Sequence, residues 1–372
     1  MKKLLLSALL LALSSHTVKA ADEVQLLADE MFLSESDATE IEAQTAEDNG
    51  DDKKSGGFFG FISRPLSKLF SSDDTENTTA LQETWLEKNV RLADEGNLNS
   101  QMDLAYIYLY GSDEVEQDFK KALQYYTMAA QQNDPIALNN LGSLYFSGIG
   151  TTRDIRTALT LFQKSAELGN DNAAINLAFI YLTGGKKDPE RNKRAIELFE
   201  SAKNKNNIAK FMLGYAYFKG FVVSQDYSKA FELIKTAAGG DTLIDEAQLV
   251  LAEMYVKGLG TVQNYQNAIS SYRAAVSQNN IEAIMMLAQI YVDGVICPKN
   301  PILAHALFNI AASQNIPDAA DKRDEIAAKM KLEELAQAQD IAQNYKETPS
   351  ELTGYIRQTY GSNIRQYIDN NI

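Results

Sequence analysis

One pattern recurs six times in this sequence, with a tyrosine every 36 to 38 residues. Each tyrosine has a leucine four residues before it, a glycine or alanine three residues before it, and a glycine three residues after it. The tyrosines are Tyr108, Tyr145, Tyr181, Tyr217, Tyr255 and Tyr291, and the leucines are Leu104, Leu141, Leu177, Leu213, Leu251 and Leu287. A self-similar period of this size is typical of a stacked repeat array.

A second set of positions follows each tyrosine by 13 or 14 residues. It starts with an alanine and continues with a bulky residue four positions later and a small one seven positions later. The sets begin at Ala122, Ala158, Ala195, Ala230, Ala268 and Ala304. Offsets of four and seven share one helical face, and a glycine after the tyrosine fits a helix end with positive φ. The sequence therefore predicts an all-α fold, an α-solenoid of helix–loop–helix repeats.

The N-terminus has the composition of a secretory signal peptide. Two lysines precede an apolar run from residue 4 to residue 13, and Val18-Lys19-Ala20 forms a small-x-small cleavage site. The apolar run is too short to span a bilayer. We expect residues 1–20 to be removed, no transmembrane segment elsewhere, and a periplasmic or secreted protein.

Residues 21–80 are predicted to form a disordered acidic leader and linker. Residues 21–52 contain twelve acidic residues and no lysine or arginine, and the whole chain has a formal charge of −15. Such a segment buries too little apolar surface to offset its conformational entropy, and the charge disfavours nucleic acid as a partner. A short apolar segment, residues 58–70, either docks on a partner or folds back onto the array.

The repeats resemble the Sel-one-like repeat (SLR) family, a relative of the tetratricopeptide repeat. The resemblance rests on motifs such as Leu141-Gly142 with Tyr145 and Gly148, and Leu213-Gly214 with Tyr217 and Gly220. It implies a right-handed superhelix and a protein-binding scaffold, often in envelope assembly, motility or contact with host cells. Some cysteine-rich relatives are linked to β-lactam binding, but their paired cysteines are absent here.

The domain layout follows from the repeat pattern and the resemblance. We expect an N-terminal capping helix at 81–96, six repeats at 97–318, C-terminal capping helices at 319–345 and a helical tail at 346–372. In the tail, Thr348-Pro349-Ser350-Glu351 suits a helix start, with proline in the first turn and serine or threonine before it. The apolar stripe of Leu352, Tyr355, Ile356 and Tyr360 suggests a small helix packed on the C-terminal cap.

The sequence contains few residues suited to catalysis or metal binding. After removal of the signal peptide, the only histidine is His305 and the only cysteine is Cys297. This scarcity excludes Cys/His zinc sites, and no cofactor, metal or catalytic residue is predicted. His305 faces away from the packed stripe, so we expect it to be exposed. Cys297 is expected to be a free thiol, with an inter-chain disulfide as an alternative.

The candidate binding residues are those that the repeat does not fix. Positions −5, −2 and +2 relative to each tyrosine lie on one face of the first helix, which lines the usual binding surface of solenoids. This face carries aromatic and methionine side chains, which are favoured at recognition sites. The predicted partner-binding residues are Tyr106, Asn140, Ser143, Asn176, Phe179, Met212, Tyr215, Val250, Glu253 and Met286. The alternative is that curvature buries positions −5 and −2 in the core.

The leading hypothesis is an exported, non-enzymatic scaffold that binds a protein or peptide. Replacing Phe179 and Tyr215 by alanine should then weaken partner capture without loss of stability, whereas Tyr145 is expected to be buried. One alternative is a secreted factor that engages a host-cell protein. Another is an envelope enzyme that acts on peptidoglycan or β-lactams through carboxylates such as Glu253 or Asp293.

Overall fold

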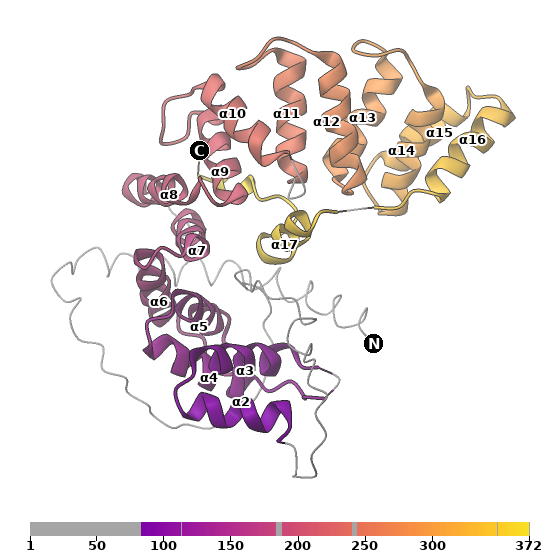
Figure 1. Cartoon of the computed structure of the whole chain (residues 1–372). Coiled ribbons are helices and arrows are strands. Elements are labelled where there is room, and N and C mark those ends of the chain that lie inside the picture. Colours follow the sequence, from indigo (N-terminus) through magenta and orange to yellow (C-terminus); the bar gives the residue numbers. More distant parts are fainter. Residues whose placement is uncertain (1–82, 113, 184–187, 240–243, 348, 372) are drawn as a thin grey trace, which may run out of the picture. The chain divides into compact units, whose positions relative to one another are not determined.

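The computed structural model describes residues 83–112, 114–183, 188–239, 244–347 and 349–371 (Figure 1). Every regular element in these residues is an α-helix. The expectations for the signal peptide, the acidic leader and residues 58–70 lie outside the described part of the chain. Among the described helices, none has the length and apolar character needed to cross a membrane. The chain divides into two compact units, residues 1–198 and 199–372.

The first unit begins with a capping helix and continues with helix pairs. Consecutive helices pack on one another from α2 to α7. Its helices are α2 (Trp85–Asp94), α3 (Leu98–Tyr110), α4 (Phe119–Gln131), α5 (Pro135–Ser147), α6 (Ile155–Glu167), α7 (Asp171–Thr183) and α8 (Pro189–Ala202), within which the division falls.

The second unit continues the helix pairs and ends in helices that do not follow the repeat. Helices α9 to α14 pack consecutively, and α14 also packs on α15 and α16. The helices are α9 (Asn207–Lys219), α10 (Tyr227–Ala237), α11 (Asp245–Lys257), α12 (Tyr265–Ser277), α13 (Ile281–Asp293), α14 (Pro301–Ser313), α15 (Ala319–Ala327), α16 (Leu332–Gln343), α17 (Glu351–Tyr360) and α18 (Gln366–Asp369).

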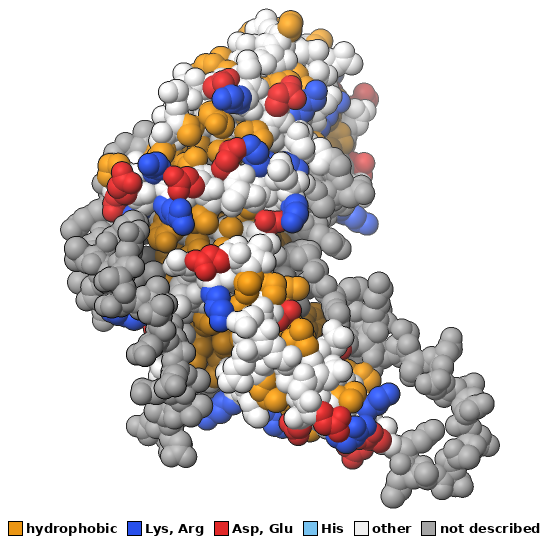
Figure 2. All heavy atoms as spheres, turned by 60° about the vertical axis from the view of Figure 1, so that its left-hand side comes forward, with side chains coloured by type: hydrophobic (Ala, Val, Ile, Leu, Met, Phe, Trp, Pro, Cys, Tyr) orange, Lys and Arg blue, Asp and Glu red, His pale blue; other side chains and the backbone are white. Residues whose placement is uncertain are grey.

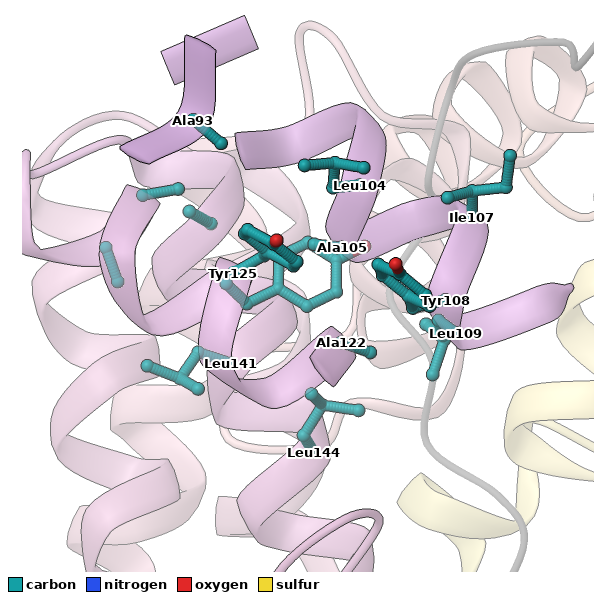
Figure 3. Packing of buried hydrophobic residues seen from close by; sticks show 14 of the residues in the cluster. Ala93, Leu104, Ala105, Ile107, Tyr108, Leu109, Ala122, Tyr125, Leu141 and Leu144 are labelled. Carbon is teal, nitrogen blue, oxygen red and sulfur yellow. The ribbon is translucent and has the colours of Figure 1, made fainter. Parts of the chain in front are cut away.

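The recurring positions form the core of both units. All six repeat leucines and all six anchor alanines are buried. So are the bulky residues four positions later, which are Tyr126, Phe162, Phe199, Ile234, Tyr272 and Phe308. Figure 3 shows this packing in the first unit, where Leu104 and Leu141 lie near Tyr125 and Ala122. The prediction of an all-α solenoid built from these positions is confirmed.

In the five repeats whose first-helix C-cap lies in the described residues, the same pair of helix caps recurs. The first helix ends at a glycine with positive φ, for example Gly148 (69°) and Gly220 (74°). The second helix begins at an aspartate or asparagine whose side chain accepts backbone N–H bonds, for example Asp154 from Thr157. The backbone N–H of this cap also donates to the carbonyl oxygen of the repeat tyrosine, at 2.9 Å from Asp154 to Tyr145.

The tyrosine ring is less buried than expected in most repeats. Tyr108 and Tyr291 are buried, but Tyr145, Tyr181, Tyr217 and Tyr255 are only partly buried. The prediction of a buried Tyr145 was therefore wrong. The tyrosine lies in the last turn of its helix, where the chain turns into the loop, so one side of the ring remains open to solvent.

The second glycine of each Gly-x-Gly pair allows close contact between successive repeats. Gly150 and Gly260 have φ values of 70° and 69°. A Cβ atom at Gly150 would overlap the backbone of Phe119, and one at Gly260 would overlap the backbone of Tyr227. Both contacts are with the start of the second helix in the preceding repeat. These glycines therefore act in packing.

Replacing Gly150 by alanine should destabilise the first unit by more than about 1 kcal/mol, because the substitution combines a positive φ with a backbone overlap. Denaturant unfolding measures the loss. The control is Gly96→Ala, where φ is also positive but nothing lies within 4 Å of the added Cβ. Equal losses in the two variants would contradict the proposed close contact.

His305 is buried, which overturns the prediction that it is exposed. Its exposed fraction is 3%. It lies in α14 beside a pocket lined by Asn309, Arg323 and Asp324, under the capping helices α15 and α16. The capping helices cover the face that the repeat pattern leaves open. Burial, with a smaller effect of Arg323, lowers the pKa of His305 below its ordinary value of 6.5.

This histidine should make the second unit less stable in mild acid. Its pKa is lower in the folded state than in the unfolded state, so stability is lost as the pH falls below about 6.5. The His305→Gln variant should lose less stability than the parent protein between pH 7.5 and pH 5. Thermal melts across this range measure the difference, and parallel pH profiles would contradict the prediction.

Candidate functional site

In the first unit, most of the predicted binding residues are buried and bonded within the chain. Asn140, Ser143, Asn176 and Phe179 are buried. The Asn176 amide donates to Asn139 Oδ1 at 2.9 Å, and the Ser143 hydroxyl donates to the Asn139 carbonyl at 3.1 Å. Tyr106 is half-buried, and its ring centroid lies 4.7 Å from that of Tyr110. The Asn176 bond therefore joins two repeats, whereas the Ser143 bond lies within α5.

In the second unit, the predicted residues fall into two groups. Met212, Tyr215 and Val250 are buried, whereas Glu253 is half-buried and bonded to Lys257 at 2.5 Å. Met286 is 39% exposed.

The burial of Phe179 and Tyr215 changes one expectation drawn from the sequence. Both side chains are at most 3% exposed. Replacing them by alanine would remove buried aromatic packing, so the expectation of unchanged stability was wrong. The role of this face in partner binding stays a prediction.

The C-terminal tail, residues 346–372, lies across the first helices of the second unit. Its side chains and backbone bond to α9, to the start of α11 and to the segment that leads into α13. Figure 1 shows α17 near α11. The expectation that this helix packs on the C-terminal cap was therefore wrong. A helix begins in this segment, but Ser350 is its N-cap and accepts from the backbone N–H of Thr353, so Pro349 precedes the cap instead of lying in the first turn.

Arg357 is held by a buried carboxylate at the start of α11. Its Nη2 atom donates to Asp245 Oδ2 at 2.7 Å and to the Gln278 carbonyl at 2.5 Å. One helical turn earlier in the tail, the Thr353 hydroxyl donates to Gln278 Oε1 at 2.6 Å. The Asn280 amide donates to the same Asp245 oxygen at 3.0 Å, so this oxygen accepts from both Asn280 and Arg357.

Arg365 lies between two carboxylates from neighbouring repeats. Its Nε donates to Glu246 Oε2 at 3.1 Å, and its Nη2 donates to Glu282 Oε2 at 2.6 Å. The backbone N–H groups of Ile364 and Arg365 also donate to Glu246, at 2.8 and 3.1 Å. Glu246 thus accepts three N–H bonds from the tail, while its side chain is 2% exposed.

At the end of the tail, where it contacts α9, the tail supplies the carboxylate and α9 supplies the cation. Tyr215 donates its hydroxyl to Asp369 at 2.8 Å, and Lys219 Nζ lies 3.3 Å from the same carboxylate. The Arg365 guanidinium lies 5.9 Å from the centroid of the Tyr215 ring. The tail therefore places its arginines on carboxylates and its aspartate beside a lysine.

Apolar side chains of the tail alternate with these charged contacts. Ile356, Tyr360, Ile364 and Ile368 are all buried. Full burial of an aliphatic side chain contributes about 1.5–3 kcal/mol, whereas ion pairs that lose water contribute little net free energy. The isoleucines therefore supply most of the attachment, and the charges determine the position of the tail.

Burial has a strong effect on the ionisation of this site. It raises the pKa of Glu246 to about 7, although Arg365 acts in the opposite direction. Burial by itself lowers the pKa of Arg365. The negative charges of Glu246 and Glu282 together have a larger effect and hold this pKa above its ordinary value. Burial and then Asp369 raise the pKa of Tyr215. The charge state of Glu246 thus changes near neutral pH.

A cavity of about 420 Å³ remains between the tail and the repeats. Asp245, Glu246 and Glu282 line it from the repeats, and Arg357, Asn363 and Arg365 line it from the tail. In the described part of the chain, no three His, Cys, Asp or Glu side chains are placed to hold a metal ion. The cavity is therefore lined by carboxylates that guanidinium groups neutralise.

The face of the described chain seen in Figure 2 has mixed charge. Acidic and basic side chains lie close together over this face. Cys297 is half-buried beside the core of the second unit, and burial raises its pKa, which lowers its reactivity.

The sequence-based prediction of the binding face did not include these carboxylates, because it considered only positions −5, −2 and +2 and not the preceding helical turn. Glu246 and Glu282 both lie nine residues before the repeat tyrosine. Position −9 is four residues from −5 and therefore lies on the same helical face. In the other four repeats this position holds Asn99, Ile136, Asn172 and Ile208. The change to glutamate in the last two repeats, together with two arginines in the tail, could have indicated the contact.

Comparison with known proteins places this architecture among repeat proteins. The Sel1 repeat family matches six consecutive segments, residues 98–134, 135–170, 171–207, 208–240, 245–280 and 281–316. The crystal structure of a Sel1 repeat protein from Oxalobacter formigenes is similar, with a TM-score of 0.53 and 25% identity. The similarity covers 62% of this chain and 99% of that one.

Two curated proteins have similar sequences. An uncharacterized protein of Neisseria meningitidis is 29% identical over 57% of this chain and 42% of its own length. Chitin synthase regulatory factor 2 of Schizosaccharomyces pombe is 29% identical over 57% of this chain and 43% of its own length. The chain thus spans less than half the length of these relatives.

Replacing Arg365 by methionine should loosen the tail, because it leaves the buried Glu246 without its cation. Breaking a buried ion pair costs about 3–5 kcal/mol. The loss of tail attachment should be larger at pH 9 than at pH 6. Without Arg365, the pKa of Glu246 rises above its present value of about 7. Glu246 is then protonated and uncharged at pH 6, whereas at pH 9 a larger share of it remains a buried, unpaired charge. Hydrogen exchange of residues 351–371 measures the opening.

The matched control is Arg194→Met, which breaks an exposed ion pair with Glu197. Exposed pairs contribute about 0–1 kcal/mol, so this variant should show a small effect at both pH values. Unchanged exchange in the Arg365 variant would contradict the assigned role of the buried pair.

Proposed function

Because this chain belongs to the Sel1 repeat family, we propose that it is an exported, non-enzymatic scaffold that binds a protein partner on the first-helix face of its repeats. Sel1 repeats generally mediate protein–protein interaction, which fits such a scaffold. The proposed partner is a protein or peptide rather than nucleic acid.

One observation carries this proposal. The first helices of the second unit already hold a polypeptide segment, the C-terminal tail, through side chains outside the repeat pattern. Glu246 and Asp245 are buried beneath it, and Tyr215 bonds to its end. A face that binds one segment in this way has the donors, acceptors and apolar contacts needed for peptide recognition.

Export is proposed from the N-terminal sequence, where two lysines, an apolar run and a small-x-small site precede the acidic leader. Mass spectrometry of the native protein should find a chain that begins at Ala21 in the envelope or culture medium. An intact N-terminus in the cytoplasm would exclude export and leave the binding proposal in place.

The binding proposal is tested at an exposed residue of the face. Met286→Glu should weaken capture of the partner at least tenfold in crosslinking pull-downs from the native envelope. Met286 is 39% exposed, so the fold should tolerate the change. The control is Val262→Glu in the loop after α11, where the side chain is 84% exposed and lies outside the face. Equal capture by both variants would exclude this part of the face.

A further inference from the structure

The contacts of the tail define a short recognition pattern. Thr353 and Arg357 are one helical turn apart and bond to Gln278 and Asp245. Eight residues after Arg357, Arg365 reaches Glu246 and Glu282, between the buried Ile364 and Ile368. Charge, hydroxyl and apolar side chains thus occur in a fixed order.

The tail does not extend the row of stacked repeat helices. The capping helices α15 and α16 already pack on α14, the last repeat helix. The tail then returns to residues 72 to 154 positions earlier in the chain. It bonds to the face that solenoids use for ligands. Its position is that of a ligand supplied by the chain itself.

The tail leaves part of this site open and contains a weak helix. The 420 Å³ cavity borders three carboxylates, of which Asp245 and Glu246 are buried and the Glu282 side chain is about half exposed. Helix α17 has ten residues and an exposed glycine, Gly354, in its interior. Helices of this length are marginal on their own, and an interior glycine weakens them further.

We infer that the groove formed by Asp245, Glu246, Gln278 and Glu282 binds an arginine-bearing segment of a partner protein, and that the tail is an internal competitor for it. This inference rests on the proposed function. The partner segment would carry a hydroxyl residue and arginine one helical turn apart, followed by a second arginine between aliphatic residues. Because the tail is tethered, its high effective concentration disfavours the partner until the tail is released.

The test uses the full chain and a labelled synthetic peptide of residues 349–372. In the Arg357→Ala/Arg365→Ala variant, the tail is weakened while the groove is unchanged. Fluorescence anisotropy should show that this variant binds the peptide at least tenfold more tightly than the parent protein. Adding Glu282→Lys to it should abolish the gain. A peptide with both arginines replaced by alanine should not bind.

A matched variant should strengthen the tail against the added peptide instead of weakening it. Gly354→Ala should strengthen α17, since nothing lies within 4 Å of the added Cβ, and should reduce peptide binding below that of the parent protein. Equal peptide binding by the parent and double variant, with exchange showing an open tail, would overturn the inference. So would loss of helical content in the double variant, which would make the tail part of the fold.

Two further outcomes separate this inference from others. A concentration-dependent dimer of the parent protein that disappears in the double variant would show tail exchange between copies and overturn the partner assignment. If Met286→Glu abolishes partner capture while the double variant captures the partner no better than the parent, the proposed function survives and this inference fails. Stronger capture by the double variant supports both.

Discussion

In five repeats, the backbone N–H of the residue that caps the second helix donates to the carbonyl of the repeat tyrosine, at 2.8 to 3.1 Å. This bond satisfies one of the carbonyls that a helix end leaves without a partner. It also fixes where the second helix begins relative to the first. In these repeats the leucine of one helix and the alanine of the other are both buried in this register.

The repeat pattern was sufficient to predict this part of the structure. The repeat needs a leucine and an alanine for the core and a glycine for a helix end with positive φ. Because the sequence contains six copies of the repeat, these three positions can be recognised without an alignment. The tyrosine was harder to place. Its carbonyl has a fixed partner, but its ring lies at the end of a helix, so burial differs between Tyr108 and Tyr145.

The candidate site could be predicted only in part, because it depends on contacts that occur once. Nothing in the period indicates that Arg365 lies beside Glu246, since the two are 119 residues apart and the tail follows no repeat. The tail lies on the first-helix face, and the role of this face in partner binding stays a prediction. The same limit applies to His305. The repeat pattern predicts which face of α14 carries its side chain, but its burial depends on capping helices that lie outside the pattern.

In several repeats, residues at positions −5 and −2 are buried, which limits how such a face can achieve specificity. If Met212, Tyr215 and Val250 support packing, their identities are constrained by the fold. Position −9 is less constrained, as its change among asparagine, isoleucine and glutamate shows. Charged groups there determine which segment fits and in which register, while apolar contacts supply affinity. These two roles fall on different positions, so the glutamates of the last two repeats hold the tail without altering the contacts that hold the stack together.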